Sequence, residues 1–178
     1  LARLNVDVRL GTAADLPTQL PVFPLRGAIL LPRAGLPLNI FEPRYLVMFD
    51  AILAGSRLVC IVQPDIRANT EPDPRTAFFA SESPQGRDVQ LRAIGTIGRL
   101  MAFQEMEDGR MIVSLAGVCR CTLQSEVPSE SLYRTFNVST AGFEGDLTPG
   151  TGEDDVPRED LLKALKGFLE ARDLKADW

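Results

Sequence analysis

The apolar positions of this chain change their spacing several times, and each change marks a predicted element. LPVFPL (residues 20–25) and the apolar patches of RGAILLPRAGLPLNIF (26–41) are interrupted by prolines and glycines, a pattern typical of short or edge strands joined by tight turns. After residue 41 the apolar side chains recur at helical spacing, as Tyr45, Leu46, Phe49, Ile52 and Leu53. We therefore predict short strands followed by one helix that ends near Gly55.

The stretch NIFEPRY (39–45) places two opposite charges and a proline where the predicted strand meets the predicted helix. Glu42 lies at the positive end of the helix dipole, which favours a carboxylate by about 0.3–1 kcal/mol, and Pro43 has the φ angle that a first turn requires. Arg44 is expected to pair with a carboxylate or a carbonyl of the neighbouring sheet. We interpret Glu42, Pro43, Arg44 and Tyr45 as a structural junction, in preference to a catalytic role for Glu42 as an acid or a base.

The middle of the chain alternates as strands do. RLVCIVQ (57–63) is a nearly continuous apolar run, typical of a buried strand. After a long loop predicted over 64–88, which contains the apolar cluster AFFA (77–80), two alternating runs flank Asp108-Gly109, the strongest hairpin signal in the chain. Glycines inside these runs predict bends at Gly95, Gly98 and Gly117. With a further strand over 132–140, the pattern predicts a small closed or nearly closed β-barrel.

Glycines and acidic residues dominate GFEGDLTPGTGEDD (142–155), as expected of a linker. Behind candidate caps at Asp154 or Asp155, VPREDLLKALKGFLEARDL predicts an amphipathic helix whose apolar stripe is Leu161, Leu162, Leu165, Phe168 and Leu169. That stripe needs a cover, either the barrel or helices that follow Trp178 in a longer natural chain. The predicted domains are an N-terminal extension (1–19), the barrel (20–141), the linker (142–154) and the helix (155–178), which is the start of a possible helical subdomain.

Charge and composition exclude several classes of protein. The 19 basic and 24 acidic residues give a net charge of −5 and a pI near 4.8, the wrong sign for general binding to phosphate backbones. No apolar run approaches the ~20 residues that span a bilayer, and the charged N-terminus does not resemble a signal peptide. We therefore expect a soluble, cytoplasmic protein without a membrane partner, for which nucleic acid is a disfavoured ligand.

The sequence contains no histidine, which excludes His-based triads, Cys-His dyads and imidazole metal sites within the chain. Its lysines all lie in the C-terminal stretch, and neither common glycine-rich nucleotide-binding motif occurs. Cys119 and Cys121 share one face of a predicted strand, so they could hold a metal with Cys60 and a carboxylate, but we favour core packing for all three. We predict no catalytic or metal-binding residues and no cofactor.

Three segments resemble the sequence signatures of one family. They are residues 20–53 with their IFEPRY core, RLVCIVQPD (57–65) and IGTIGRLMAFQEMEDGRMIVSLAGVCRC (94–121). They are similar to the N-terminal substrate-binding domain of the Lon ATP-dependent protease and of its stand-alone bacterial relatives, over about Leu20 to Lys175. Cys121 departs from the pattern, because an aromatic residue is usual there. The resemblance implies a mainly β, α+β fold: a PUA-like six-stranded pseudo-barrel with one helix after the second strand and a C-terminal helical segment.

The resemblance brings neither the Walker loop nor the Ser-Lys proteolytic domain of the protease, so it implies recognition without catalysis. The chain is expected neither to hydrolyse ATP nor to cleave casein-like substrates. The implied partners are unfolded or partly folded polypeptides, with a separate ATP-dependent protease as a candidate second partner. Prolines that interrupt the first strands favour exposed apolar side chains there, and the candidate peptide-binding residues are Phe23, Leu25, Ile29, Leu30, Leu31, Leu36, Phe78 and Phe79.

Two other functions stay open at this point. PUA-like barrels can bind RNA, and a cluster of Arg26, Arg33, Arg87, Arg92 and Arg99 on one surface would favour that function. An unrecognised enzyme is disfavoured, because no nucleophile-base pair or metal-ligand spacing is visible. The salt dependence of binding separates a peptide ligand from RNA, since phosphate contacts weaken steeply with salt and apolar contacts do not.

Overall fold

The computed structural model describes residues 2–3, 12–65, 89–152 and 154–172, which form two compact units divided between Thr148 and Pro149. The first unit contains most of the secondary structure: β1 (Ala2–Arg3), η1 (Ala13–Asp15), β2 (Gln19–Pro24), β3 (Gly35–Ile40), α1 (Pro43–Ala54), β4 (Leu58–Pro64), β5 (Leu91–Glu105), β6 (Met111–Val127), β7 (Arg134–Ser139) and η2 (Glu144–Leu147). The second unit contains α2 (Arg158–Ala171). Of the loop predicted over 64–88, Pro64 is instead the last residue of β4, and residues 66–88, with the AFFA cluster, lie outside the described residues.

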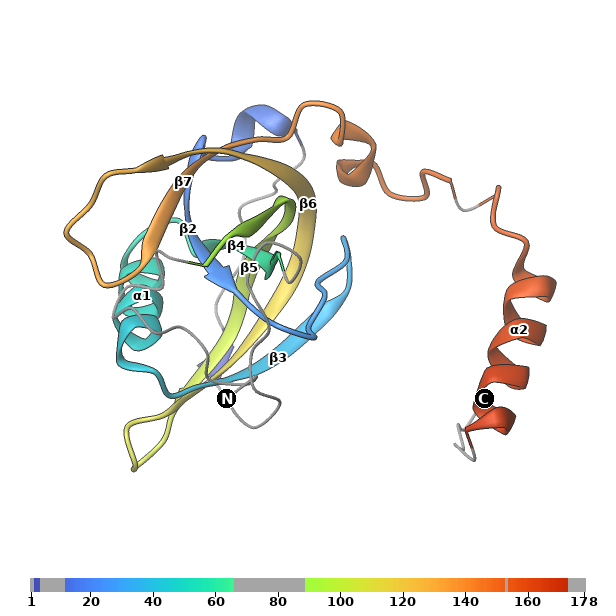
Figure 1. Cartoon of the computed structure of the whole chain (residues 1–178), viewed down its shortest axis with the longest axis horizontal. Helices are drawn as coiled ribbons and strands as arrows, with labels where there is room; N and C mark the ends of the chain where they lie inside the picture. Colours follow the sequence, from blue (N-terminus) through green and yellow to red (C-terminus); the bar gives the residue numbers. More distant parts are fainter. Residues whose placement is uncertain (1, 4–11, 66–88, 153, 173–178) are drawn as a thin grey trace. The chain divides into compact units, whose positions relative to one another are not determined.

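The strands of the first unit form a nearly closed barrel (Figure 1). Five strands pair in a ring in the order β2, β4, β5, β6 and β7, and the antiparallel pairing of β7 with β2 closes it. β3 pairs with the first half of β6, the two-residue β1 pairs with β5, and the contact of β2 with β4 is parallel. The predicted α+β fold, with a six-stranded pseudo-barrel and a helix after the second of these strands, is confirmed.

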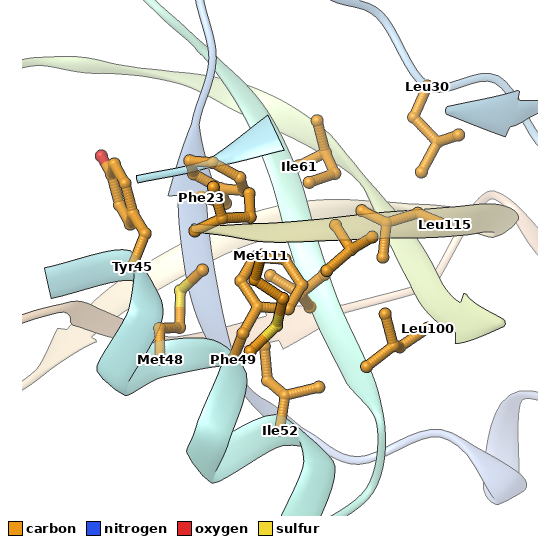
Figure 2. Close-up of a cluster of buried hydrophobic side chains, with 13 residues drawn as sticks. Phe23, Leu30, Tyr45, Met48, Phe49, Ile52, Ile61, Leu100, Met111 and Leu115 are labelled. Atoms are coloured by element: carbon orange, nitrogen blue, oxygen red, sulfur yellow. The ribbon is translucent and has the colours of Figure 1, made fainter. Parts of the chain in front are cut away.

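β4 is buried on both faces, as its apolar run predicts. Leu58, Cys60 and Val62 contribute to a core inside the barrel, together with Leu20, Ile97 and Val138 among others. The alternate residues, Val59 and Ile61, contribute to a second core that α1 covers. Figure 2 shows this second core, in which Tyr45, Met48, Phe49 and Ile52 project from α1 toward side chains of the strands. One central strand therefore joins both hydrophobic cores.

The junction before α1 has the predicted position but a different set of side-chain bonds. Glu42 is the N-cap residue and Pro43 follows in the first turn. The Glu42 carboxylate accepts no capping bond from the helix backbone; instead it forms an ion pair with Arg44, at 2.6 Å between Oε2 and Nη2. The Arg44 guanidinium also lies 4.5 Å from the centre of the Tyr45 ring, which packs against Phe23. The carboxylate that Arg44 binds is therefore that of the junction itself.

β5 and β6 form the long hairpin predicted around Asp108-Gly109, with Gly109 at φ +82° in the turn. The register of the two strands shifts next to Gly98, and a Cβ atom on Gly95 would lie 2.8 Å from the Ile61 carbonyl oxygen. A Cβ atom on Gly117 would lie only 2.0 Å from the Leu31 carbonyl oxygen. These glycines allow close backbone contacts and changes of register that a side chain would prevent.

The second unit contains the predicted amphipathic helix, but its predicted caps are wrong. α2 starts after Pro157, whose carbonyl accepts the first helical hydrogen bond, from Leu161 N–H at 3.0 Å. Asp155 precedes the helix in a turn, in which its N–H donates to the Gly152 carbonyl. Neither Asp154 nor Asp155 is therefore at the N-cap position. The apolar side chains Leu161, Leu162, Leu165 and Phe168 are exposed.

Candidate functional site

An apolar groove crosses the outer face of the barrel wall formed by β4, β5 and β6. Its floor includes Ile61, Thr96 and Arg120, which are directly paired across the three strands. Ile94 and Gln63 extend the floor toward one end, and residues 28–31 form the opposite wall. The groove encloses about 200 Å³, which is below the usual ~300–1,000 Å³ of pockets for drug-sized ligands. It is suited to a few side chains rather than to a nucleotide.

The wall residues 28–31 belong to a longer segment, residues 26–34, which we call the rim loop. This loop is held at both ends. Near its start, Leu25 N–H donates to the Val62 carbonyl at 2.9 Å, and the Gln63 side-chain amide donates to the Ala28 carbonyl. Near its end, Arg33 N–H donates to the Gly117 carbonyl at 2.8 Å. In between, Leu30 is buried against the position of Gly98. The rim loop is thus anchored in the core by Leu30, while the side chains on either side of it, Ile29 and Leu31, are exposed.

Three large apolar side chains at the groove are exposed to solvent. Ile29 is 72% exposed, Leu31 60% and Ile94 53%, and all three line the groove. They come from the rim loop on one side and from β5 on the other. Exposed apolar side chains that gather around a concave surface are typical of interaction sites.

The single charged residue among those that line the groove, Arg120, is neutralised by a neighbouring carboxylate. Its Nε and Nη2 atoms each donate to Asp146 at 2.8 Å, and its guanidinium lies 4.8 Å from the centre of the Phe143 ring. These hydrogen bonds, together with the nearby charge of Arg33, hold the pKa of Asp146 below its ordinary value, so the carboxylate stays ionised at neutral pH. The groove is therefore apolar without an uncompensated charge.

The structure places the predicted peptide-binding residues in three environments. Ile29 and Leu31 are exposed at the groove. Phe23 and Leu30 are buried in the core, and Leu25 and Leu36 are half-buried against it. Phe78 and Phe79 lie outside the described residues. Prolines and apolar spacing indicated the segment that forms one wall of the groove, but they did not separate its anchoring side chains from its exposed ones.

Sequence reasoning missed the β5 and β6 side of the groove. Ile94, Thr96 and Arg120 point outward from strands that alternate between the barrel interior and the surface. A signal was available for Ile94, an apolar residue at an outward position of an alternating strand. The signal could not connect it to Ile29 and Leu31, because the pairing of Ile61, Thr96 and Arg120 depends on registers between distant segments.

Cys60, Cys119 and Cys121 are buried core residues, which agrees with the core packing that we favoured over a metal site. The Sγ atoms of Cys60 and Cys121 are 3.6 Å apart, and their hydrogen bond and burial raise the pKa of Cys60. Burial and the nearby Asp146 raise the pKa of Cys119 to about 11, and its thiol donates to the Phe143 carbonyl. Within the described ranges, no three side chains of the metal-ligating types gather to hold an ion.

The arginines that would favour RNA binding lie in different surroundings. Arg33 donates to the Asp146 carbonyl, and Arg92 pairs with Asp65 at 3.4 Å. Arg99, on β5, lies near Arg57, and its pKa is lowered by burial and by that second arginine. Arg87 lies outside the described residues. Arg33 and Arg92 each lie near an aspartate, Asp146 and Asp65, which partly balances their charge.

In the part of the chain that the structure describes, no helix has both the length and the apolar character needed to cross a bilayer.

Comparisons with known proteins match most of the chain. The family model described as "ATP-dependent protease La (LON) substrate-binding domain" matches residues 19–172. A Lon protease of Flavobacterium johnsoniae is 28% identical over 130 residues, which are 73% of this chain but 14% of the protease. This chain thus spans a small part of that relative's length.

Two solved structures have a similar fold. A Lon N-terminal domain protein from Xanthomonas campestris superposes with a TM-score of 0.50 at 24% identity, covering 69% of this chain and 59% of the other. The N-terminal domain of a Lon protease from the Mycobacterium avium complex superposes with a TM-score of 0.56 at 15% identity, covering 87% and 69%.

Proposed function

This chain belongs to the family of Lon substrate-binding domains, and we propose that it is a non-catalytic module that captures unfolded or partly folded polypeptides for ATP-dependent proteolysis. The observation that carries this proposal is the neutral groove edged by Ile29, Leu31 and Ile94. The family description supplies the class of ligand, a protein substrate, and the groove supplies a surface on which apolar side chains of that substrate lose contact with water.

The size and chemistry of the groove favour a few apolar side chains of an extended segment. Burying a Val, Leu, Ile, Phe or Met side chain contributes about 1.5–3 kcal/mol, and part of this gain offsets the freedom lost on association, so a few such contacts give weak binding. A charged ligand group would have to compete with Asp146 for Arg120, or would lie unpaired in an apolar site at a cost in free energy. The groove therefore favours apolar segments, which folded proteins bury and unfolded proteins expose.

Affinity should be modest, because a disordered client loses chain entropy when it binds. We expect a Kd on the order of micromolar or weaker. A client that exposes several apolar segments would then bind and dissociate repeatedly, a behaviour suited to transfer to a protease.

Fluorescence anisotropy with a labelled, permanently unfolded polypeptide, such as reduced and carboxymethylated α-lactalbumin, tests the proposal. We expect saturable binding, and we expect Leu31→Ser or Ile94→Ser to weaken it by about 5- to 30-fold, the equivalent of one to two kcal/mol. The matched control is Leu132→Ser, because Leu132 is also an exposed leucine in a connecting segment, at 42%, but does not line the groove.

Equal losses in the groove variants and in the control would contradict the proposal, as would the absence of binding by the wild type. Affinity should change little between about 0.1 and 0.5 M salt, because apolar contacts are not screened. If RNA bound instead, with an affinity that fell steeply over the same range, the module would be an RNA-binding barrel.

A further inference from the structure

The short helix η2 packs against β6, next to the Arg120 end of the groove floor. Phe143, which precedes η2, and Leu147, at its end, pack against the core inside the barrel. The Phe143 carbonyl accepts a hydrogen bond from the Cys119 thiol at 3.3 Å. Residues 143–147 are therefore part of the folded barrel unit, which extends to Thr148.

From this position, Asp146 contacts both sides of the groove. Its carboxylate accepts three hydrogen bonds from Arg120 of β6, from the backbone N–H at 2.9 Å and from Nε and Nη2 at 2.8 Å each. Its backbone carbonyl accepts a bond from Arg33 Nη1 of the rim loop at 3.0 Å. The Asp146 side chain is only 11% exposed, whereas the Arg120 side chain is 49% exposed, so solvent reaches the pair from the arginine side.

We propose that Asp146 is a positioning residue that holds the rim loop at a fixed distance from β6 and thereby sets the width of the groove. Two features support this role. Asp146 bonds to an arginine on each side, and its negative charge lies close to both guanidinium groups. The carboxylate therefore attracts the arginine of the rim loop as well as the arginine of β6. The effect on peptide affinity rests on the function proposed above, whereas the effect on the rim loop does not.

Replacing Asp146 by asparagine keeps the backbone carbonyl that Arg33 binds, but it removes the negative charge that attracts both Arg33 and Arg120. The rim loop, which is the more weakly bound of the two sides, should then move away from β6. The amides that report this movement are those of Arg33 and Ala34, whose N–H groups donate to Gly117 and Leu31 at 2.8 and 3.0 Å.

Hydrogen exchange followed by NMR on the whole chain tests the proposal. In Asp146→Asn, we expect the Arg33 and Ala34 amides to exchange at least about fivefold faster, while the amide of Val59 in the central strand changes little. Peptide affinity should fall about fivefold or more, within the usual range for coupled sites. Raising the salt to about 1 M, where the screening length is about 3 Å, should accelerate exchange at these two amides more in the wild type than in Asp146→Asn, because salt screens an attraction that the variant lacks.

The matched control is Glu126→Gln. It removes an arginine-carboxylate pair of similar length, 2.7 Å to Arg134, between β6 and β7. Arg33→Gln provides a second test if Asp146→Asn does not fold, because it removes the bond to the rim loop and keeps the pair of Arg120 with Asp146. It should also accelerate exchange at Ala34.

The possible outcomes are separable. Faster exchange confined to the rim loop supports the proposal even if no peptide binds, in which case only the proposed function fails. Unchanged exchange at Ala34 in both variants overturns the proposal, even if the wild type binds peptide. The same acceleration in Glu126→Gln, or the same effect of salt on the wild type and on Asp146→Asn, would show that the charge of Asp146 does not hold the rim loop and would also overturn the proposal.

Discussion

At the scale of single residues, Glu42 and Arg44 illustrate how one ion pair stabilises the start of a helix. The Glu42 carbonyl accepts hydrogen bonds from Tyr45 N–H and Leu46 N–H at 2.9 and 3.0 Å, so its backbone begins α1. Its carboxylate binds Arg44, whose side chain is only 13% exposed because it lies over the Tyr45 ring. The pair therefore covers the aromatic cluster of Phe23, Tyr45 and Phe49 on the side of the helix start.

Alanine at Glu42 or at Arg44 should lower the free energy of unfolding by about 0.5–2 kcal/mol, and the double variant should lose less than the sum, because the two side chains act together. Urea denaturation of the four proteins measures this coupling. The Asp108–Arg110 pair, which is exposed in the hairpin turn, serves as the comparison and should show weaker coupling. Additive losses at Glu42 and Arg44 would contradict the structural role of the pair.

The position of this junction could be predicted from the sequence, but its bonds could not. Pro43 and the helical spacing that follows it are local signals, so they located the first turn of α1. The partner of Arg44 depends on side-chain directions, and the close approach of Arg44 to Tyr45 depends on the packing of Tyr45 against Phe23, a residue of a different strand.

At the scale of elements, the contact between the rim loop and β6 depends on the missing side chain of Gly117. The two backbones exchange hydrogen bonds here, from Arg33 N–H to Gly117 and from Gly117 N–H to the Ala34 carbonyl, both at 2.8 Å. A methyl group at Gly117 would overlap the backbone of Leu31, so one of the two elements would have to move.

Gly117→Ala should therefore destabilise the protein by about 1–3 kcal/mol, as other overpacked sites do, and should weaken peptide binding because Leu31 shifts. Thermal denaturation and the anisotropy assay measure the two effects. Gly35→Ala is the matched control: it lies on β3 opposite Ala116, has open space around its Cα atom, and should change stability by less than about 0.5 kcal/mol. Equal stability of the two variants would show that the rim loop is not held against β6.

Most elements were predictable because their signals lie within a few residues of sequence. Spacing identified α1, Asp108-Gly109 identified the hairpin, and the continuous apolar run identified β4 as a buried strand. The groove was not predictable in the same way. Its floor joins β4, β5 and β6, and the register shifts near Gly98 and between Val62 and Pro64 decide which side chains meet. No local pattern contains that information.

At the scale of the whole molecule, exposed apolar side chains gather in each of the two described units. In the barrel unit they lie at the groove, as Ile29, Leu31 and Ile94, and in the second unit they form the stripe on α2. The groove is concave, and its walls are held in place by bonds from Gln63, Gly117 and Asp146. The central claim is that polypeptide clients bind at the groove.

NMR tests this claim most directly. The backbone amide shifts of the chain, which at 19.5 kDa is within reach of the method, are followed while unlabelled, permanently unfolded polypeptide is added. We predict saturable shifts at residues 28–31, 94–96 and 120, with small changes in the barrel interior. Shifts confined to α2, at Leu161, Leu162, Leu165 and Phe168, would contradict the claim. So would the absence of shifts at about 1 mM polypeptide, because the binding free energy would then be weaker than about 4 kcal/mol.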